Sequence, residues 1–158
     1  MDNGEHRCPP KEIKVKISTK GRYALRFMID LAENGNDKYI SLKDISIRQD
    51  VSLKYLEQIA SALVKAGLVQ SVRGSQGGYR LTRAPAEYTV GDILRPIEGE
   101  FACVACLESS PNLCERYETC QTVHFWEGLS KVITDYLDGT TLEDLMNQGS
   151  QSCGYYVI

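Results

Sequence analysis

The stretch from Asp50 to Thr82 constrains the fold most strongly, because one amphipathic helix runs there directly into one short hairpin. Ser52 is a good N-cap residue, since its hydroxyl can accept a hydrogen bond from a free amide of the first turn. Gly67 ends the helix, as a residue free to adopt positive φ should. Apolar residues recur between these ends at helical spacing, which predicts one buried face: Leu56, Ile59, Ala60 and Leu63.

Two β-rich runs follow this helix, Leu68–Arg73 and Tyr79–Thr82, and a glycine-rich loop at 74–78 joins them. The arms carry one basic residue each, Arg73 and Arg80, and the loop has the composition of a hairpin tip. A helix with a polar outer face, followed at once by a basic hairpin, is how a winged helix-turn-helix contacts DNA. The loop lacks the spacing of a phosphate-binding P-loop, so we interpret it as a wing.

The charge distribution favours the same interpretation. Residues 14–83 hold 13 lysines and arginines against 6 acidic residues, whereas residues 84–158 hold 3 against 12. The overall charge of −3 therefore conceals a basic half that suits a polyanion. No apolar run approaches the ~20 residues needed to cross a bilayer, and no signal peptide is apparent, so we expect a cytoplasmic protein without a membrane partner.

Helical signals also flank this stretch. A helix over residues 18–33 has an apolar stripe of Ala24, Phe27, Met28 and Leu31, and a second helix opens at Ser41 with Asp44 as its capping partner. Thr89 and Asp92 cap a further short helix after the hairpin. The predicted fold class is mainly α with a small β-hairpin wing, a winged helix-turn-helix followed by a long C-terminal dimerisation helix.

The dimerisation helix is expected over residues 121–137, where the apolar face is too broad for a small DNA-binding domain to cover. A homodimer would bury this face against its own copy and would match a two-fold DNA site. Thr140 and Glu143 should cap a last short helix that ends near Met146. The apolar face of the long helix comprises Trp126, Leu129, Val132, Ile133, Tyr136 and Leu137.

We accordingly divide the chain into five segments. An enzyme is not expected, because the two histidines stand apart and no nucleophile–base grouping is evident. The segments are a disordered N-terminal extension at 1–13, the winged helix-turn-helix at 14–98, a cysteine-bearing loop at 99–120, the dimerisation and final helices at 121–147, and a flexible tail at 148–158.

Three runs of the sequence resemble one family of bacterial regulators: KISTKGRYALRFMIDLA at 16–32, VSLKYLEQI at 51–59 and AGLVQSVRGSQGGYRLTRAP at 66–85. The family is typified by the iron–sulfur cluster regulator (IscR) and includes a nitric-oxide-sensing repressor and the cysteine-metabolism repressor (CymR). The resemblance implies a homodimeric regulator of transcription that binds double-stranded DNA, with two winged domains and crossed dimerisation helices.

The resemblance places base and phosphate contacts on the helix after Ser52 and on the wing. Lys20 and Arg22, at the start of the first helix, are further candidates for phosphate contacts. A glutamate in the major groove would accept from cytosine and disfavour other bases. The full candidate set for DNA is Lys20, Arg22, Ser52, Lys54, Tyr55, Glu57, Arg73 and Gly74.

The chain has six cysteines, and Cys106, Cys114 and Cys120 stand where cluster-binding members of the family hold iron–sulfur ligands. Thiolates are the usual ligands of [2Fe–2S] and [4Fe–4S] clusters. The fourth ligand stays open between Cys103, His124 and a residue of the other subunit. Two further hypotheses are tetrahedral zinc, for which Cys103 completes four thiols, and thiols that bind nothing or react with oxidants.

The last four residues, Tyr155, Tyr156, Val157 and Ile158, are apolar and follow a polar, small-residue linker. One hypothesis is that they pack on the dimerisation helices. The other is that they dock into a partner, as C-terminal carboxylates are captured by backbone amides. The ending resembles the isoleucine-terminated tails that engage cysteine synthase (O-acetylserine sulfhydrylase), so the alternative function is a cysteine-metabolism repressor controlled by that enzyme, without a cluster.

Overall fold

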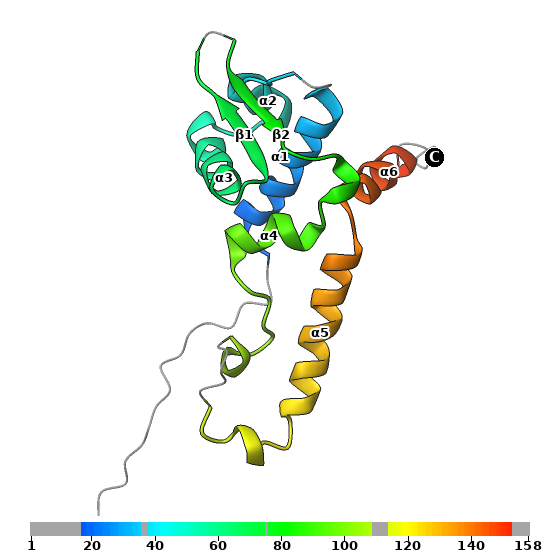
Figure 1. The fold of residues 1–158 in the computed structure, drawn as a ribbon. Coiled ribbons are helices and arrows are strands. Elements are labelled where there is room, and N and C mark those ends of the chain that lie inside the picture. The colour runs from blue at the N-terminus through cyan, green and yellow to red at the C-terminus, as the bar shows by residue number, and fades with distance from the viewer. Residues whose placement is uncertain (1–16, 36–37, 75, 109–113, 153–158) are drawn as a thin grey trace, which may run out of the picture.

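The computed structural model describes residues 17–35, 38–74, 76–108 and 114–152. A winged domain lies at one end, and the long helix α5 projects from it beside the cysteine-bearing loop (Figure 1). The winged domain contains α1 (Thr19–Gly35), α2 (Leu42–Gln49), α3 (Leu53–Lys65), β1 (Val69–Val72), β2 (Gly78–Leu81), η1 (Pro85–Glu87) and α4 (Val90–Glu98). The remainder contains η2 (Ala105–Leu107), η3 (Tyr117–Thr119), α5 (Val123–Gly139) and α6 (Leu142–Ser152).

The predicted fold class is confirmed: six α-helices accompany one two-stranded antiparallel sheet in the described residues. The helix-turn-helix pair begins where its caps were expected. The Ser41 hydroxyl accepts from the Asp44 amide at the start of α2, and the Ser52 hydroxyl accepts from the Tyr55 amide at the start of α3. Between the helices Asp50 adopts φ 51°, a left-handed conformation that Asp tolerates better than most residues.

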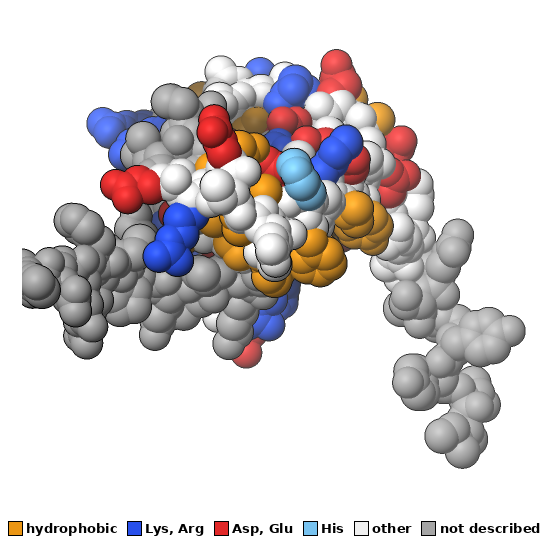
Figure 2. Space-filling view, turned by 90° about the horizontal axis from the view of Figure 1, so that it is seen from below, with side chains coloured by type: hydrophobic (Ala, Val, Ile, Leu, Met, Phe, Trp, Pro, Cys, Tyr) orange, Lys and Arg blue, Asp and Glu red, His pale blue; other side chains and the backbone are white. Residues whose placement is uncertain are grey.

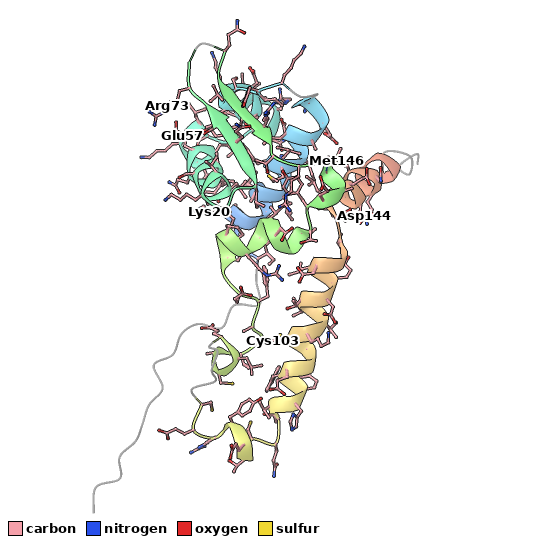
Figure 3. The ribbon with its side chains drawn as sticks, in the orientation of Figure 1. Lys20, Glu57, Arg73, Cys103, Asp144 and Met146 are labelled. Atoms are coloured by element: carbon pink, nitrogen blue, oxygen red, sulfur yellow. The ribbon has the colours of Figure 1, made fainter. Side chains whose placement is uncertain are left out.

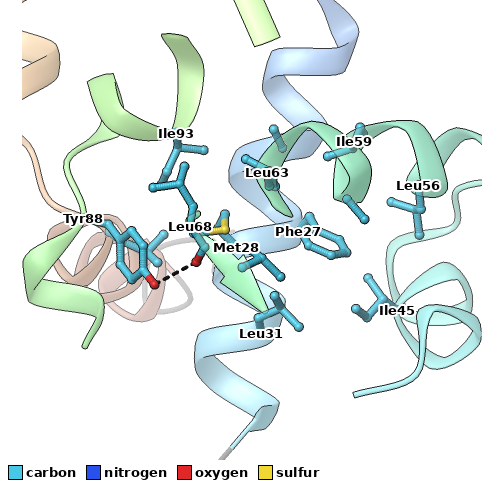
Figure 4. Close-up of a cluster of buried hydrophobic side chains, with 14 of the residues drawn as sticks. Phe27, Met28, Leu31, Ile45, Leu56, Ile59, Leu63, Leu68, Tyr88 and Ile93 are labelled. Atoms are coloured by element: carbon cyan, nitrogen blue, oxygen red, sulfur yellow. Dashed lines mark hydrogen bonds between the residues drawn. The ribbon is translucent and has the colours of Figure 1, made fainter. Parts of the chain in front are cut away.

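The core lies where α1, α3, the sheet and α4 meet (Figure 4). The predicted stripe of α3 is at most 1% exposed, and that of α1 at most 2%. Phe27 of α1 is fully buried and meets Tyr79 of β2 edge to face, with ring centroids 6.1 Å apart. Burial of this stripe fixes the rotation of α3, so its opposite face is turned to solvent.

An ion pair between the buried Asp30 and the exposed Arg48 joins α1 to α2. Asp30 is only 2% exposed, and its carboxylate accepts hydrogen bonds from Arg48 Nε at 3.0 Å and from Gln49 Nε2 at 2.8 Å. The bond from Arg48 to Asp30 raises the pKa of the guanidinium above its ordinary value. Because every donor comes from the last turn of α2, the contact sets the angle at which the helix-turn-helix leaves α1.

Tyr88 anchors the base of the wing, where the chain enters β1 and leaves β2. In the strand register Val69 lies opposite Leu81 and Val72 lies opposite Gly78. The fully buried Tyr88 hydroxyl accepts from the amides of Thr82 and Arg83, each at 2.8 Å, and donates to the carbonyl of Leu68 at 2.9 Å. The chain leaving β2 is therefore tied to the chain entering β1 (Figure 4).

The C-terminal helices differ from expectation in three details. The helix α5 begins at Val123 rather than Gln121. The capping pair of α6 is Thr141 with Asp144, one residue later than the predicted Thr140 with Glu143; the Thr141 amide donates to Asp144 Oδ2 at 2.9 Å. The helix α6 also continues to Ser152, so part of the segment predicted as linker and flexible tail is helical. The predicted extension at 1–13 and the residues after Ser152 lie outside the described part.

Within the ranges that the structure describes, no helix is long and apolar enough to span a membrane.

Tyr88→Phe tests the anchor of the wing. The substitution keeps the ring but removes the acceptor of the Arg83 amide, the shorter bond of the Thr82 amide and the donor to Leu68, so we expect a loss of unfolding free energy of about 2–4 kcal/mol. The measurement is chemical denaturation followed by circular dichroism. Tyr79→Phe, which removes a hydroxyl from a half-buried ring, is the matched control, and equal losses in the two variants would contradict this role.

Candidate nucleic-acid interface

The outward face of α3 is polar along its length. Lys54, Glu57 and Gln58 are exposed, because the opposite side of the helix carries the buried stripe. With Ser61, and with Lys20 from the start of α1, they line a shallow open hollow. Side chains that both donate and accept hydrogen bonds therefore stand on a convex helix, which is the shape and chemistry that read base edges in a major groove.

The N-terminal turn of α3 is held in place by aromatic contacts. Tyr55 is half-buried, and its ring meets Tyr23 of α1 edge to face with centroids 5.9 Å apart. The guanidinium of Arg26 lies 4.9 Å from the Tyr23 ring and donates to Gln49 at 2.9 Å. The N-terminal end of α3, where the positive end of the helix dipole favours phosphate, is therefore held in a fixed position.

The arginines on the two arms of the wing have different surroundings. Arg73 is exposed just after β1, beside Gly74 at the wing tip. Arg80 lies over the Tyr39 ring at 4.9 Å and donates to Gln70 at 3.1 Å, so its charge is tied to the sheet. Figure 3 shows Arg73 on the same side of the winged domain as Lys20 and Glu57. The wing thus presents Arg73 alongside the polar face of α3.

The structure separates the two basic residues that the sequence grouped at the start of α1. Lys20 joins α3 at the hollow, whereas Arg22 lies on another face of α1, where it lines a second hollow with Leu145 of α6. Gln58 and Ser61, which were not among the predicted contacts, do join the α3 face. Their spacing from Lys54, at i+4 and i+7, is a helical signal that could have identified them.

The cysteine-bearing loop lies beside α5, away from this face. Cys103 is 5% exposed, and its amide donates to the Ser130 hydroxyl of α5 at 3.1 Å. Cys106 is exposed, while Cys114 and Cys120 are half-buried. A hydrogen bond with the Thr122 hydroxyl lowers the pKa of Cys120 below the ordinary value of a thiol, which favours the reactive and metal-binding thiolate.

His124 lies at the surface of α5 with its side chain 90% exposed, and Nδ1 is 3.2 Å from Glu127 Oε2. The other oxygen of Glu127 accepts from the Tyr117 hydroxyl, so this carboxylate joins the loop to the helix. These two bonds lower the pKa of Glu127, the bond from Tyr117 most, and the same bond raises the pKa of Tyr117. His124 is thus engaged with Glu127.

The residue types of this loop suit a metal centre, but the positions of its described side chains do not form one. Three thiols form a donor set that suits an iron–sulfur cluster or zinc. In the part of the chain that the structure describes, however, no three histidine, cysteine or acidic side chains are close enough to hold one metal ion.

A family model named Rrf2, described as an iron-dependent transcriptional regulator, matches residues 17–148. The chain is 42% identical over 132 residues to the HTH-type transcriptional regulator IscR of Aliivibrio salmonicida, which covers 84% of this chain and 77% of that protein. It is 38% identical over 136 residues to the protein rrf2 of Nitratidesulfovibrio vulgaris, covering 86% and 90%.

Solved structures give the same result. The structure is similar to CymR, the global cysteine regulator of B. subtilis, with a TM-score of 0.69 and 41% identity over 85% of this chain and 98% of that one. It is also similar to IscR of T. potens, with a TM-score of 0.69 and 38% identity over 90% and 94%.

Arg73→Ala separates DNA contact from folding. The side chain is exposed, so we expect the free energy of unfolding to change by less than about 0.5 kcal/mol. If Arg73 contacts phosphate, binding weakens on all DNA sequences alike and the salt slope of the binding constant falls by about one unit. Fluorescence anisotropy at several salt concentrations measures the affinity and its salt slope. Arg80→Ala is the control, and wild-type affinity in Arg73→Ala would contradict the assignment.

Proposed function

The chain belongs to the Rrf2 family of transcriptional regulators, and we propose that it is a homodimer whose DNA binding answers to the state of its cysteine loop. The observation that carries the proposal is the pairing of two exposed surfaces on one chain. One is the polar face of α3 with Arg73 beside it, and the other is an uncovered apolar stripe on α5. The first suits a DNA groove, and the second suits another copy of the chain.

The stripe on α5 supports the dimer. Phe125, Leu129, Val132 and Tyr136 recur at intervals of four, three and four residues, which is the spacing of a helix–helix seam. Their exposed fractions are 64%, 38%, 65% and 72%. Figure 2 views this end of the molecule and shows hydrophobic side chains at the surface near His124, drawn in pale blue. Burial against the same helix of a second chain would give a two-fold dimer with two winged domains.

Val132→Glu tests the dimer. A carboxylate in the middle of the seam would have to be buried without a partner, so we expect monomers and a loss of operator affinity of at least about tenfold. Sedimentation equilibrium and anisotropy measure the two effects. Lys131→Gln alters the neighbouring exposed residue, whose ammonium pairs with Asp135 at 2.7 Å, and should leave the dimer intact. A wild-type monomer at tens of micromolar would refute the proposal.

The sensing half of the proposal concerns Cys106, Cys114 and Cys120, which would hold an iron–sulfur cluster. Such a cluster supplies a centre whose oxidation state and integrity respond to oxygen and iron. The hydrogen bond with Thr122 that lowers the pKa of Cys120, and the description of the family as iron-dependent, support this assignment. Because Cys103 is buried against α5, we assign it to packing, and the fourth ligand falls to His124 or to the partner subunit.

The three cysteines should act as a set. Replacing any one of Cys106, Cys114 or Cys120 by Ala should abolish the visible absorption of the anaerobically reconstituted protein, because a cluster that lacks a ligand is labile. Cys103→Ala is the matched control and should keep the absorption, and His124→Ala tests the fourth ligand. Wild type that binds zinc tightly and takes up no iron would overturn the cluster assignment.

A second candidate function is favoured by the similarity to the cysteine regulator CymR. In it the apolar tail from Tyr155 to Ile158, which lies outside the described residues, docks into cysteine synthase, and the enzyme controls DNA binding. A synthetic peptide of residues 149–158 should then bind the host's synthase at micromolar concentration and be displaced by O-acetylserine. The peptide without Ile158 is the control. Absence of binding by the full-length dimer at tens of micromolar would exclude this function.

A further inference from the structure

A side-chain contact joins the start of α1 to the end of α4, across 80 residues of sequence. Glu98 is the last residue of α4, and its Oε1 accepts from the Ser18 amide at 3.1 Å and from the Ser18 hydroxyl at 2.6 Å. The Ser18 hydroxyl in turn accepts from the Gly21 amide at 3.1 Å, as an N-cap does. One carboxylate oxygen therefore fixes the residue that caps the start of α1. We call Glu98 and Ser18 the clasp.

The surroundings of the clasp are built for this close approach. A Cβ atom on Gly21 would lie 2.2 Å from Glu98 Oε1, so any larger residue there would push the carboxylate away. The negative end of its own helix dipole disfavours Glu98 at the end of α4, whereas the positive end of α1 favours it. The clasp therefore brings a carboxylate from an unfavourable helix terminus to a favourable one.

On one side the clasp leads to the DNA face. Lys20 stands two residues after Ser18, in the first turn of α1, and lines the hollow formed by Lys54, Glu57 and the other outward residues of α3. The direction of that first turn decides whether Lys20 lies beside α3. Glu98 holds both the amide and the hydroxyl of Ser18, two residues before Lys20.

On the other side the clasp leads to the cysteine loop. Gly99, with φ 86°, ends α4 directly after Glu98, and Cys103 follows with its amide bonded to Ser130 of α5. The helix α4 is itself bound to α5 by Arg95, whose Nη2 lies 2.8 Å from Asp138 Oδ2. The short segment between Glu98 and Cys103 is thus the direct covalent path from the loop to the winged domain.

We propose that Glu98 is a positioning residue for DNA binding, which holds Ser18 so that Lys20 stands beside α3 and which passes the conformation of the cysteine loop to that contact. The inference rests on the proposed function, since it names the path by which the loop would control the DNA face. Disturbing the loop displaces Glu98, frees Ser18 and withdraws Lys20 from the groove.

A double-mutant cycle between Glu98 and Lys20 tests the positioning role in the full-length protein. The probe is an operator selected by wild type from a random-sequence duplex library. Glu98→Ala and Lys20→Ala should each weaken binding by about five- to tenfold. The double variant should bind no more weakly than either single variant, because the two substitutions remove the same contact with DNA. Glu98→Gln should restore affinity, since its amide oxygen still accepts from Ser18. Glu33→Ala, on an exposed carboxylate near the other end of α1, is the control.

Thermal melts accompany each variant, and Ser18→Ala replaces Glu98→Ala in the cycle if the latter does not fold. Additive losses, or undiminished affinity in Glu98→Ala, would overturn the positioning role. Alkylation of the loop thiols with iodoacetamide tests the coupling. Alkylation should change the DNA affinity of wild type at least about threefold and leave that of Glu98→Ala unaffected. A change of equal size in the two proteins would overturn the coupling. If wild type selects no DNA sequence, the proposed function itself fails.

Discussion

The packing of α3 against α1 is the interaction on which the rest of the molecule depends. Because the apolar residues of α3 recur with the helical period, burying Leu56, Ile59 and Leu63 around Phe27 leaves only one rotation of the helix. That rotation turns Lys54 and Glu57 outward. The ion pair of buried Asp30 with Arg48 fixes the end of α2 that leads into α3, and Tyr88 fixes the base of the wing that follows α3. The exposed polar face of α3 is therefore a consequence of core packing.

The features predicted correctly from the sequence are local ones. Caps such as Ser41 and Thr89, and the stripe of α3, depend on residues within a few positions, so their spacing reveals them. Tyr88 and the bond between Glu98 and Ser18 join residues far apart in sequence, and no periodicity encodes them. The continuation of α6 to Ser152 was also missed, because a capped first turn allows polar residues of low helix propensity to extend a helix.

For the candidate sites too, the sequence predicted the residue types, whereas their positions depend on packing. Lys20 and Arg22 are neighbours in sequence, yet the turn of the helix sends them to different hollows, and only packing shows which one joins α3. The cysteines were found by residue type alone, and their type predicts soft-metal chemistry without placing the ligands. The long helix was identified by the width of its apolar face, and the structure shows that Val132 and Tyr136 on this face are exposed.

The central claim is that two copies of α3 read one DNA site together, with a wing beside each. Hydroxyl-radical footprinting of a selected operator, bound by the full-length protein, tests it most directly. The account predicts a two-fold symmetric footprint on one face of the duplex, with half-site centres separated by whole turns of about 10 base pairs and added protection at each flank from the wings. A single asymmetric footprint, or uniform protection of every sequence offered, would contradict it.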